Sequence, residues 1–123
     1  MRRIMLVRGI RGAITVNENT KKEILSGTKE LLLAIKKLND FDIEDIVSIF
    51  FSTTPDLNSA FPAAAARELG WSEAPLFGTQ EANVHYGLKK CIRILIQINC
   101  EKKQNEIKHC YLREAKNLRK DLQ

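Results

Sequence analysis

Two arginines alternate with glycines near the start of the chain, where an apolar run leads into Arg8-Gly9-Ile10-Arg11-Gly12. A guanidinium offers a rigid fork of donors that matches the geometry of a carboxylate or a phosphate. A glycine inside a strand pattern often marks a bulge, or a close approach by a ligand or another backbone. The segment therefore favours one of two structures: a strand that delivers an arginine to an anion, or an edge strand with solvated arginines that kinks at its glycines.

Three further side chains have the chemistry to contact an anion or a hydroxyl group. Glu81 falls in an expected loop, whereas Arg93 and Tyr111 fall in strand-like runs. The sequence contains no serine–histidine–acid set, no glycine-rich phosphate loop and no dense histidine cluster, and we interpret the isolated His85 and His109 as surface or strand residues. Such a set suits the binding of a small dianion and the stabilisation of charge, because it lacks a nucleophile.

The cysteines favour a structural role rather than a metal site. Cys91, Cys100 and Cys110 are odd in number and have no CxxC spacing, which argues against a disulfide framework and a zinc knuckle. His109 adjoins Cys110, but neighbours on a strand point to opposite faces of a sheet, so one ion would not reach both. We therefore expect no metal.

Length and composition are those of one globular domain, which we place at residues 1–123. No apolar run approaches the roughly 18–20 residues of a membrane span. The apolar residues 4–7 are too few for the core of a signal peptide. We therefore expect a cytoplasmic location and no membrane partner.

The formal net charge of +5 allows a nucleic-acid surface or a pocket for a small polyanion. Basic residues are spread along the chain with acidic residues between them, and there is no basic tail. This distribution favours the pocket, and we expect no nucleic-acid partner.

A long amphipathic helix is predicted from Thr20 to near Asn39. Thr20 is the expected N-cap, and Glu23 is expected to reach back to the Thr20 amide in a capping box. Apolar residues then recur at steps of three and four, which indicates one buried stripe. The stripe contains Ile24, Leu25, Thr28, Leu31, Leu32, Ile35 and Leu38.

A shorter helix is predicted between two further strand-like segments. Pro62 suits a first helical position, the alanines at 63–66 favour a helix, and Gly70 suits the position just past its end. The preceding run at 46–53 is continuously apolar, as in a strand buried on both faces. The following segment at 71–77 contains a proline, which confines a strand to an edge or a bulge.

The clearest alternation covers residues 91–99, where four isoleucines occupy every second position and Arg93 lies on the opposite face. A first strand at 3–16 and a last strand at 108–114 complete the order β-α-β-α-β-β-β. We predict an α+β domain, with a mixed sheet packed on one long and one short helix. Because the second face of such a sheet is half-polar and uncovered, we expect the chain to form an oligomer.

Five blocks occur in an order and at spacings that resemble one known family. The blocks are Arg8-Gly9-Ile10-Arg11-Gly12-Ala13, Thr54-Pro55-Asp56-Leu57, Ala60-Phe61-Pro62-Ala63, Arg67-Glu68-Leu69 and Gly87-Leu88-Lys89-Lys90-Cys91-Ile92-Arg93. The chain resembles the monofunctional trimeric chorismate mutases over nearly its whole length. The resemblance implies a trimer that forms a pseudo-α/β barrel, with active sites at its subunit interfaces. It implies the pericyclic rearrangement of chorismate to prephenate in aromatic amino-acid biosynthesis, without a cofactor or a covalent intermediate.

The resemblance also implies a role for each matching residue. Arg93 corresponds to the cation at the ether oxygen and one carboxylate of the substrate. Arg11 corresponds to the arginine that binds the side-chain carboxylate, and Tyr111 to the hydroxyl that shares this task. Glu81 corresponds to the carboxylate that accepts a hydrogen bond from the ring hydroxyl. Arg8 is left as a structural or interface arginine.

Four more residues match positions on the other side of such an interfacial site. Phe61 and Ala63 of the neighbouring subunit correspond to an apolar wall, and Arg67 to an interface arginine. Arg119 corresponds to a C-terminal arginine that helps to close the site. A surface charge is the alternative for Arg67, and a core aromatic with a satisfied hydroxyl is the alternative for Tyr111.

Some positions depart from the family pattern. Gly78 stands where a cysteine is common, Ala64 where a lysine is common, and Phe77 where a small polar residue is common. These departures keep a second function open, a non-catalytic module that binds a small carboxylate on the same trimeric scaffold. Residues three apart in a regular strand face opposite ways, so Arg8 and Arg11 could both serve one pocket only with a distortion at Gly9. The resemblance selects Arg11 alone as the arginine that faces the substrate, and we expect the glycines to let the chain turn so that Arg11 reaches it.

Overall fold

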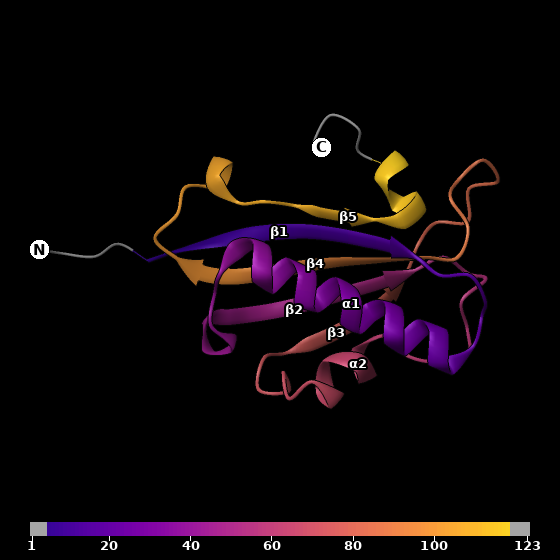
Figure 1. The fold of residues 1–123 in the computed structure, drawn as a ribbon, viewed down its shortest axis with the longest axis horizontal. Coiled ribbons are helices and arrows are strands. Elements are labelled where there is room, and N and C mark those ends of the chain that lie inside the picture. The colour runs from indigo at the N-terminus through magenta and orange to yellow at the C-terminus, as the bar shows by residue number, and fades with distance from the viewer. Residues whose placement is uncertain (1–4, 119–123) are drawn as a thin grey trace, which may run out of the picture.

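A computed structural model describes residues 5–118 of the chain, and within them a five-stranded sheet carries two α-helices (Figure 1). The strand order is β3-β2-β4-β1-β5. The pairs β1–β4 and β2–β4 are antiparallel, whereas β1–β5 and β2–β3 are parallel. The elements are β1 (Leu6–Thr15), α1 (Lys21–Asn39), β2 (Ile46–Thr53), α2 (Ala63–Glu68), β3 (Leu76–Gln80), β4 (Cys91–Cys100) and β5 (Cys110–Leu112). The predicted α+β class, the mixed sheet and the order of elements are confirmed.

Helix α1 lies across one face of the sheet, and α2 lies beside the β3 edge (Figure 1). The core lies between α1 and the inner positions of the two longest strands. The predicted isoleucine face of β4 is fully or almost fully buried there. The core side chains include Ile10 and Ile14 of β1, Ile24, Leu31, Leu32 and Ile35 of α1, and Ile92, Ile94, Ile96 and Ile98 of β4.

The prediction that the chain turns at the glycines is wrong, because β1 continues through them as a regular strand. The β1–β4 register runs without a shift from Leu6 opposite Cys100 to Thr15 opposite Cys91. The second glycine has a packing reason instead. A Cβ atom on Gly12 would lie 2.6 Å from Cδ1 of Ile35 and 3.2 Å from Cδ1 of Leu31, so the missing side chain lets α1 approach the sheet.

The N-terminus of α1 is capped by Thr20, as predicted, and Thr20 Oγ1 accepts a hydrogen bond from the Glu23 amide at 3.1 Å. The prediction that the Glu23 side chain accepts from the Thr20 amide is wrong, because Glu23 Oε1 accepts from the Asn17 amide instead. At the other end, Leu38 is 47% exposed and lies outside the buried stripe. Asn39 is buried instead of Leu38. Its side-chain Nδ2 donates to Ile35 O and to Lys108 O, and its Oδ1 accepts from the Lys108 amide.

Two strand boundaries differ from the prediction. The segment 71–75 is a loop in which Trp71 is buried against Phe41, so β3 begins only at Leu76, although it is an edge strand as expected. Strand β5 ends at Leu112, because Arg113 takes a left-handed φ of 55° and begins a 3-10 helix.

Outside the small buried cluster of Ala13, Cys91 and Ala115, the sheet face opposite α1 is open in the single chain. The register places Arg11, Phe50, Phe77, Arg93 and Leu95 on it. Phe50 is 39% and Phe77 is 61% exposed, so the prediction that 46–53 is buried on both faces is wrong for the isolated chain. An open face with exposed aromatic rings is what the expected oligomer would cover.

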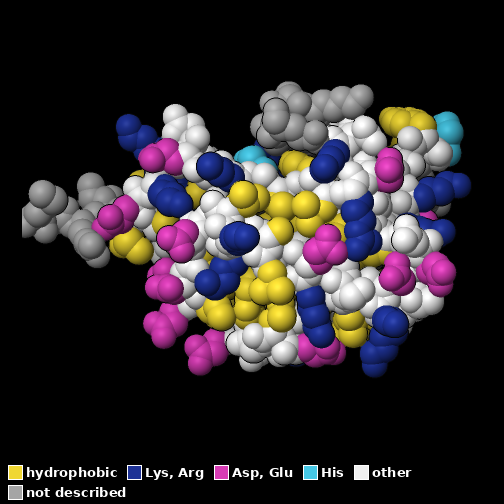
Figure 2. Space-filling view, viewed as in Figure 1, with side chains coloured by type: hydrophobic (Ala, Val, Ile, Leu, Met, Phe, Trp, Pro, Cys, Tyr) yellow, Lys and Arg dark blue, Asp and Glu magenta, His cyan; other side chains and the backbone are white. Residues whose placement is uncertain are grey.

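Charges of both signs are interspersed over the face that α1 covers, with hydrophobic side chains gathered between them (Figure 2). No helix within residues 5–118 is both long and apolar enough to cross a membrane.

Candidate active site

A pocket of about 270 Å³ opens on the sheet face opposite α1. It brings together four of the predicted site residues, which come from three strands and the loop after β3. Its lining residues are Arg11, Gly12, Phe50, Ser52, Glu81, Arg93, Ile94, Leu95 and Tyr111. We call it the sheet pocket.

Arg93 lies near the middle of the sheet, opposite Ala13 of β1 and Ser52 of β2. Its Nε atom is 3.8 Å from Glu81 Oε1, and the two side chains are 48% and 26% exposed. The Glu81 backbone is fixed by a 2.8 Å hydrogen bond from its amide to Thr53 O. An ion pair this long and this exposed stabilises little, so the pair leaves the guanidinium available to an anion.

Arg11 and Tyr111 approach the same pocket from the other side of β4. Arg11 lies opposite Leu95, and its backbone amide donates to His109 Nδ1 at 2.9 Å. Tyr111 lies beside Ala13 in the parallel pair and is half-buried against a small apolar cluster. The pocket therefore has two cations and a phenol on one sheet face.

Arg8 faces the other side of the sheet, where its Nε donates to Lys102 O at 2.8 Å. This contact agrees with the structural role expected for Arg8.

The cysteines are free thiols, as predicted. Burial raises the pKa of the Cys91 thiol to about 11, and the nearby Arg93 cation offsets part of this effect. Burial also raises the pKa of Cys110. Because the thiolate is the reactive form, both side chains behave as small apolar groups. Within residues 5–118, no three His, Cys, Asp or Glu side chains are grouped so that they could hold a metal ion.

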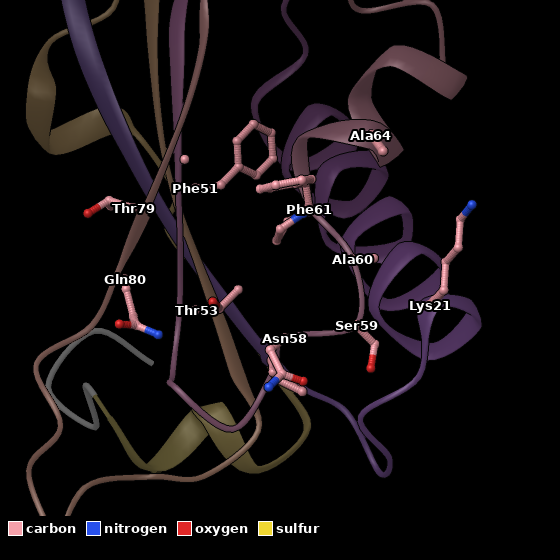
Figure 3. Close-up of a pocket in the computed structure, with 13 residues that line it drawn as sticks. Lys21, Phe51, Thr53, Asn58, Ser59, Ala60, Phe61, Ala64, Thr79 and Gln80 are labelled. Carbon is pink, nitrogen blue, oxygen red and sulfur yellow. The ribbon is translucent and has the colours of Figure 1, made fainter.

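A second, larger pocket of about 800 Å³ lies near α2 and the β3 edge (Figure 3). Phe61 lines it and is 80% exposed, and Ala64 and Gly78 line it too. We call it the edge pocket. Its full lining is Lys21, Phe51, Thr53, Leu57, Asn58, Ser59, Ala60, Phe61, Pro62, Ala64, Gly78, Thr79 and Gln80.

The other predicted residues are not brought to the sheet pocket. Ala63 is half-buried beside the core, and Arg67 is exposed on α2 and lines neither of the two pockets. Arg119 lies outside the described residues. Within one chain, therefore, the expected charged half and the expected apolar half of the site are separate.

Sequence reasoning missed two kinds of residue around these pockets. Phe50 and Ser52 line the sheet pocket, and reading every second position of 46–53 would have placed them on the face of Arg93. Asn19 was also missed, although it holds the segment that leads to Phe61. Its Oδ1 accepts from the Asn58 and Ser59 amides at 3.0 and 3.1 Å. No local sequence pattern predicts this contact, because the partners are 39 and 40 residues further along the chain.

Comparisons with known proteins agree with one another. A family model described as chorismate mutase type I matches residues 7–122. Chorismate mutase AroH of Bacillus subtilis (strain 168) is 47% identical over 119 residues, which cover 96% of this chain and 94% of that protein. Chorismate mutase AroH of Thermus thermophilus is 44% identical, over 96% of this chain and 98% of that protein. A solved structure of a chorismate mutase from Clostridium thermocellum is similar with a TM-score of 0.87 and 44% identity, covering 89% of this chain and 97% of that one.

Proposed function

The chain belongs to the chorismate mutase type I family, and on that premise we propose that it converts chorismate to prephenate at the sheet pocket. The observation that carries the proposal is the convergence of Arg11, Glu81, Arg93 and Tyr111 on one sheet face. The reaction breaks an ether C–O bond while a C–C bond forms in the same molecule. It therefore needs a shaped and charged pocket rather than a nucleophile.

Arg93 stabilises the transition state in this account. Negative charge grows on the ether oxygen as the C–O bond breaks, so a guanidinium aimed at that oxygen binds the transition state more tightly than the ground state. Arg93 suits this task because it lies at the centre of the pocket-lining strands and its contact with Glu81 is long.

The remaining three side chains hold the substrate in its reactive shape. Arg11, with the Tyr111 hydroxyl, binds the side-chain carboxylate, and Glu81 accepts a hydrogen bond from the ring hydroxyl. Fixing a flexible dianion in a compact, chair-like geometry removes much of the entropic barrier to an intramolecular reaction.

A second subunit completes the site in this proposal. We infer a homotrimer of the pseudo-α/β-barrel type, in which Phe61 and Ala63 of a neighbouring subunit form the apolar wall and its Arg67 lies at the interface. Three observations support this arrangement: the 80% exposure of Phe61, its place in a pocket separate from Arg93, and the exposed aromatic rings of the open sheet face. Arg119 would help to close the site from the C-terminal end.

The enzyme acts in aromatic amino-acid biosynthesis, and we place it in the cytoplasm. We also propose that its ligands are chorismate and prephenate, and that neither nucleic acid nor a membrane is a partner. On the face that Figure 2 shows, acidic and basic side chains are mixed rather than gathered by sign, which supports this view.

The experiment is to incubate the purified chain with chorismate and to follow prephenate formation. We expect saturable turnover without any added cofactor. Tight binding of a bicyclic transition-state mimic without turnover, even at high protein concentration, would instead favour the non-catalytic carboxylate-binding module.

A further inference from the structure

Asp56 lies in the turn after β2 and lines neither the sheet pocket nor the edge pocket, yet its carboxylate joins two strands. The Lys90 amide donates to both of its oxygens, at 2.9 Å to Oδ2 and 3.2 Å to Oδ1. The Thr54 hydroxyl donates to Oδ1 and accepts from the Cys91 amide at 3.0 Å. The end of β2 is thereby tied to the first residues of β4.

Lys90 takes an unusual backbone conformation at this junction. Its φ is 50°, in the left-handed region that residues other than glycine rarely adopt. Such a residue keeps its conformation only where its surroundings hold it. Besides Asp56, two groups at the exit of β1 hold Lys90: the Val16 amide donates to Lys90 O at 2.9 Å, and Lys90 Nζ donates to Asn17 O at 3.2 Å.

The same junction lies next to the two charged residues at the centre of the sheet pocket. Arg93 is only three residues beyond Lys90, so the place where β4 begins sets the position from which its side chain extends. Glu81 is fixed to Thr53 O, and Thr53 directly precedes Thr54. A substitution of Asp56 that shifts the backbone at Lys90 or Thr54 is therefore expected to move the two charged side chains, Arg93 and Glu81, that this backbone positions.

We propose that Asp56 is a positioning residue for the reaction: its hydrogen bonds to the Lys90 amide and the Thr54 hydroxyl fix the start of β4, and through it the guanidinium of Arg93. This inference rests on the proposed function. The Asp56 carboxylate does not line the pocket that holds the substrate, and its effect on turnover passes through Arg93.

A double-mutant cycle tests the inference, with kcat measured for the wild type, Asp56→Ala, Arg93→Lys and the double variant. We expect Asp56→Ala to lower kcat about tenfold in the wild-type background, because a small misplacement of a reacting group is costly. In the Arg93→Lys background the same change is expected to cost no more than about twofold, since the group that it positions is already lost. An equal fall in both backgrounds, as a loss of folded protein would give, would overturn the inference.

The control is Glu106→Ala, which removes another exposed carboxylate that accepts a backbone hydrogen bond, from the Lys103 amide at 2.9 Å. We expect this variant to keep the wild-type kcat. If Asp56→Ala does not fold, Asp56→Asn keeps the shape of the side chain while losing its charge, and it enters the same cycle.

Amide hydrogen exchange gives a readout that does not depend on activity. In Asp56→Ala, or in Asp56→Asn where that replaces it, the peptide covering residues 88–94 is expected to exchange faster than in the wild type, with α1 unchanged. Unchanged exchange in that peptide would overturn the positioning role. A wild-type chain without turnover would contradict the proposed function alone.

Discussion

Arg93 Nε lies 3.8 Å from Glu81 Oε1, although the two residues reach this point from different parts of the sheet. Arg93 extends from the central strand β4. Glu81 follows the edge strand β3, and its backbone amide donates to Thr53 O of β2, the strand between them. The two charges are close enough to orient each other and too exposed to neutralise each other. A substrate whose ether oxygen gains negative charge in the transition state, and whose hydroxyl donates a hydrogen bond, can therefore use both side chains.

Glu81→Gln keeps the size of the side chain but removes its charge. We expect kcat/KM to fall by about tenfold to a hundredfold, since a hydrogen bond to a charged group contributes about 1.5–3 kcal/mol. Steady-state kinetics with chorismate measure this effect, and Glu106→Gln serves as the matched control. A Glu81→Gln variant with wild-type kcat/KM would remove Glu81 from the site.

Gly12→Ala tests the close approach of α1 to the sheet. The added Cβ would lie 2.6 Å from Ile35 Cδ1, in a fully buried part of the core. We expect the free energy of unfolding to fall by about 1–3 kcal/mol, as in other overpacked cores. Urea unfolding at a fixed protein concentration gives this value.

Gly78→Ala is the control for that substitution, because a Cβ on Gly78 meets nothing within 4 Å. We expect its unfolding midpoint to stay at or slightly above the wild-type value. Equal losses in the two alanine variants would show that helix packing is not the reason for Gly12.

The raised pKa of Cys91 predicts a pH dependence of stability. The folded chain holds the thiol proton up to a pKa of about 11, whereas an unfolded cysteine releases it near pH 8.5. The native state is therefore favoured below the unfolded pKa, and this contribution is lost as pH rises toward the folded pKa. We expect the difference in unfolding free energy between the wild type and Cys91→Ala to narrow from pH 8 to pH 11. A constant difference across that range would contradict the buried, neutral thiol.

Mixing two inactive variants tests whether the site is shared between subunits. Arg93→Lys damages the sheet pocket, and Phe61→Asp damages the expected apolar wall. If each site combines these residues from two subunits, random reassembly of equal amounts regenerates about a quarter of the sites intact. Chorismate turnover of the refolded mixture measures this recovery. Activity equal to the average of the two separate variants would contradict a shared site.

The elements that the sequence patterns predicted well are those whose signals are local. The alternating isoleucines of β4 and the Thr20 cap of α1 lie where expected, because each depends on neighbours along the chain. The exposure of Leu38 and Phe50 was not predicted, because burial is decided by what packs against a residue from elsewhere.

At the site, too, local sequence signals predicted some features, whereas contacts between distant parts of the chain decided others. The family resemblance selected Arg11, Glu81, Arg93 and Tyr111, and in the structure all four line one pocket. The glycine pattern was noticed, but its reason lies in α1, more than twenty residues away at Ile35. Asp56 carried no predicted role, since its partner Lys90 is 34 residues further along the chain.

Steady-state turnover of chorismate by the wild type and by Arg93→Lys tests whether the Arg93 guanidinium stabilises the transition state, with Arg8→Lys as the matched control on the opposite sheet face. A lysine keeps the charge but not the guanidinium fork, so we predict that Arg93→Lys loses about 10²–10³-fold in kcat. Arg8→Lys is predicted to keep the wild-type kcat, because Arg8 donates to the backbone carbonyl of Lys102 and neither residue lines the pocket. A wild-type kcat in Arg93→Lys would contradict the account.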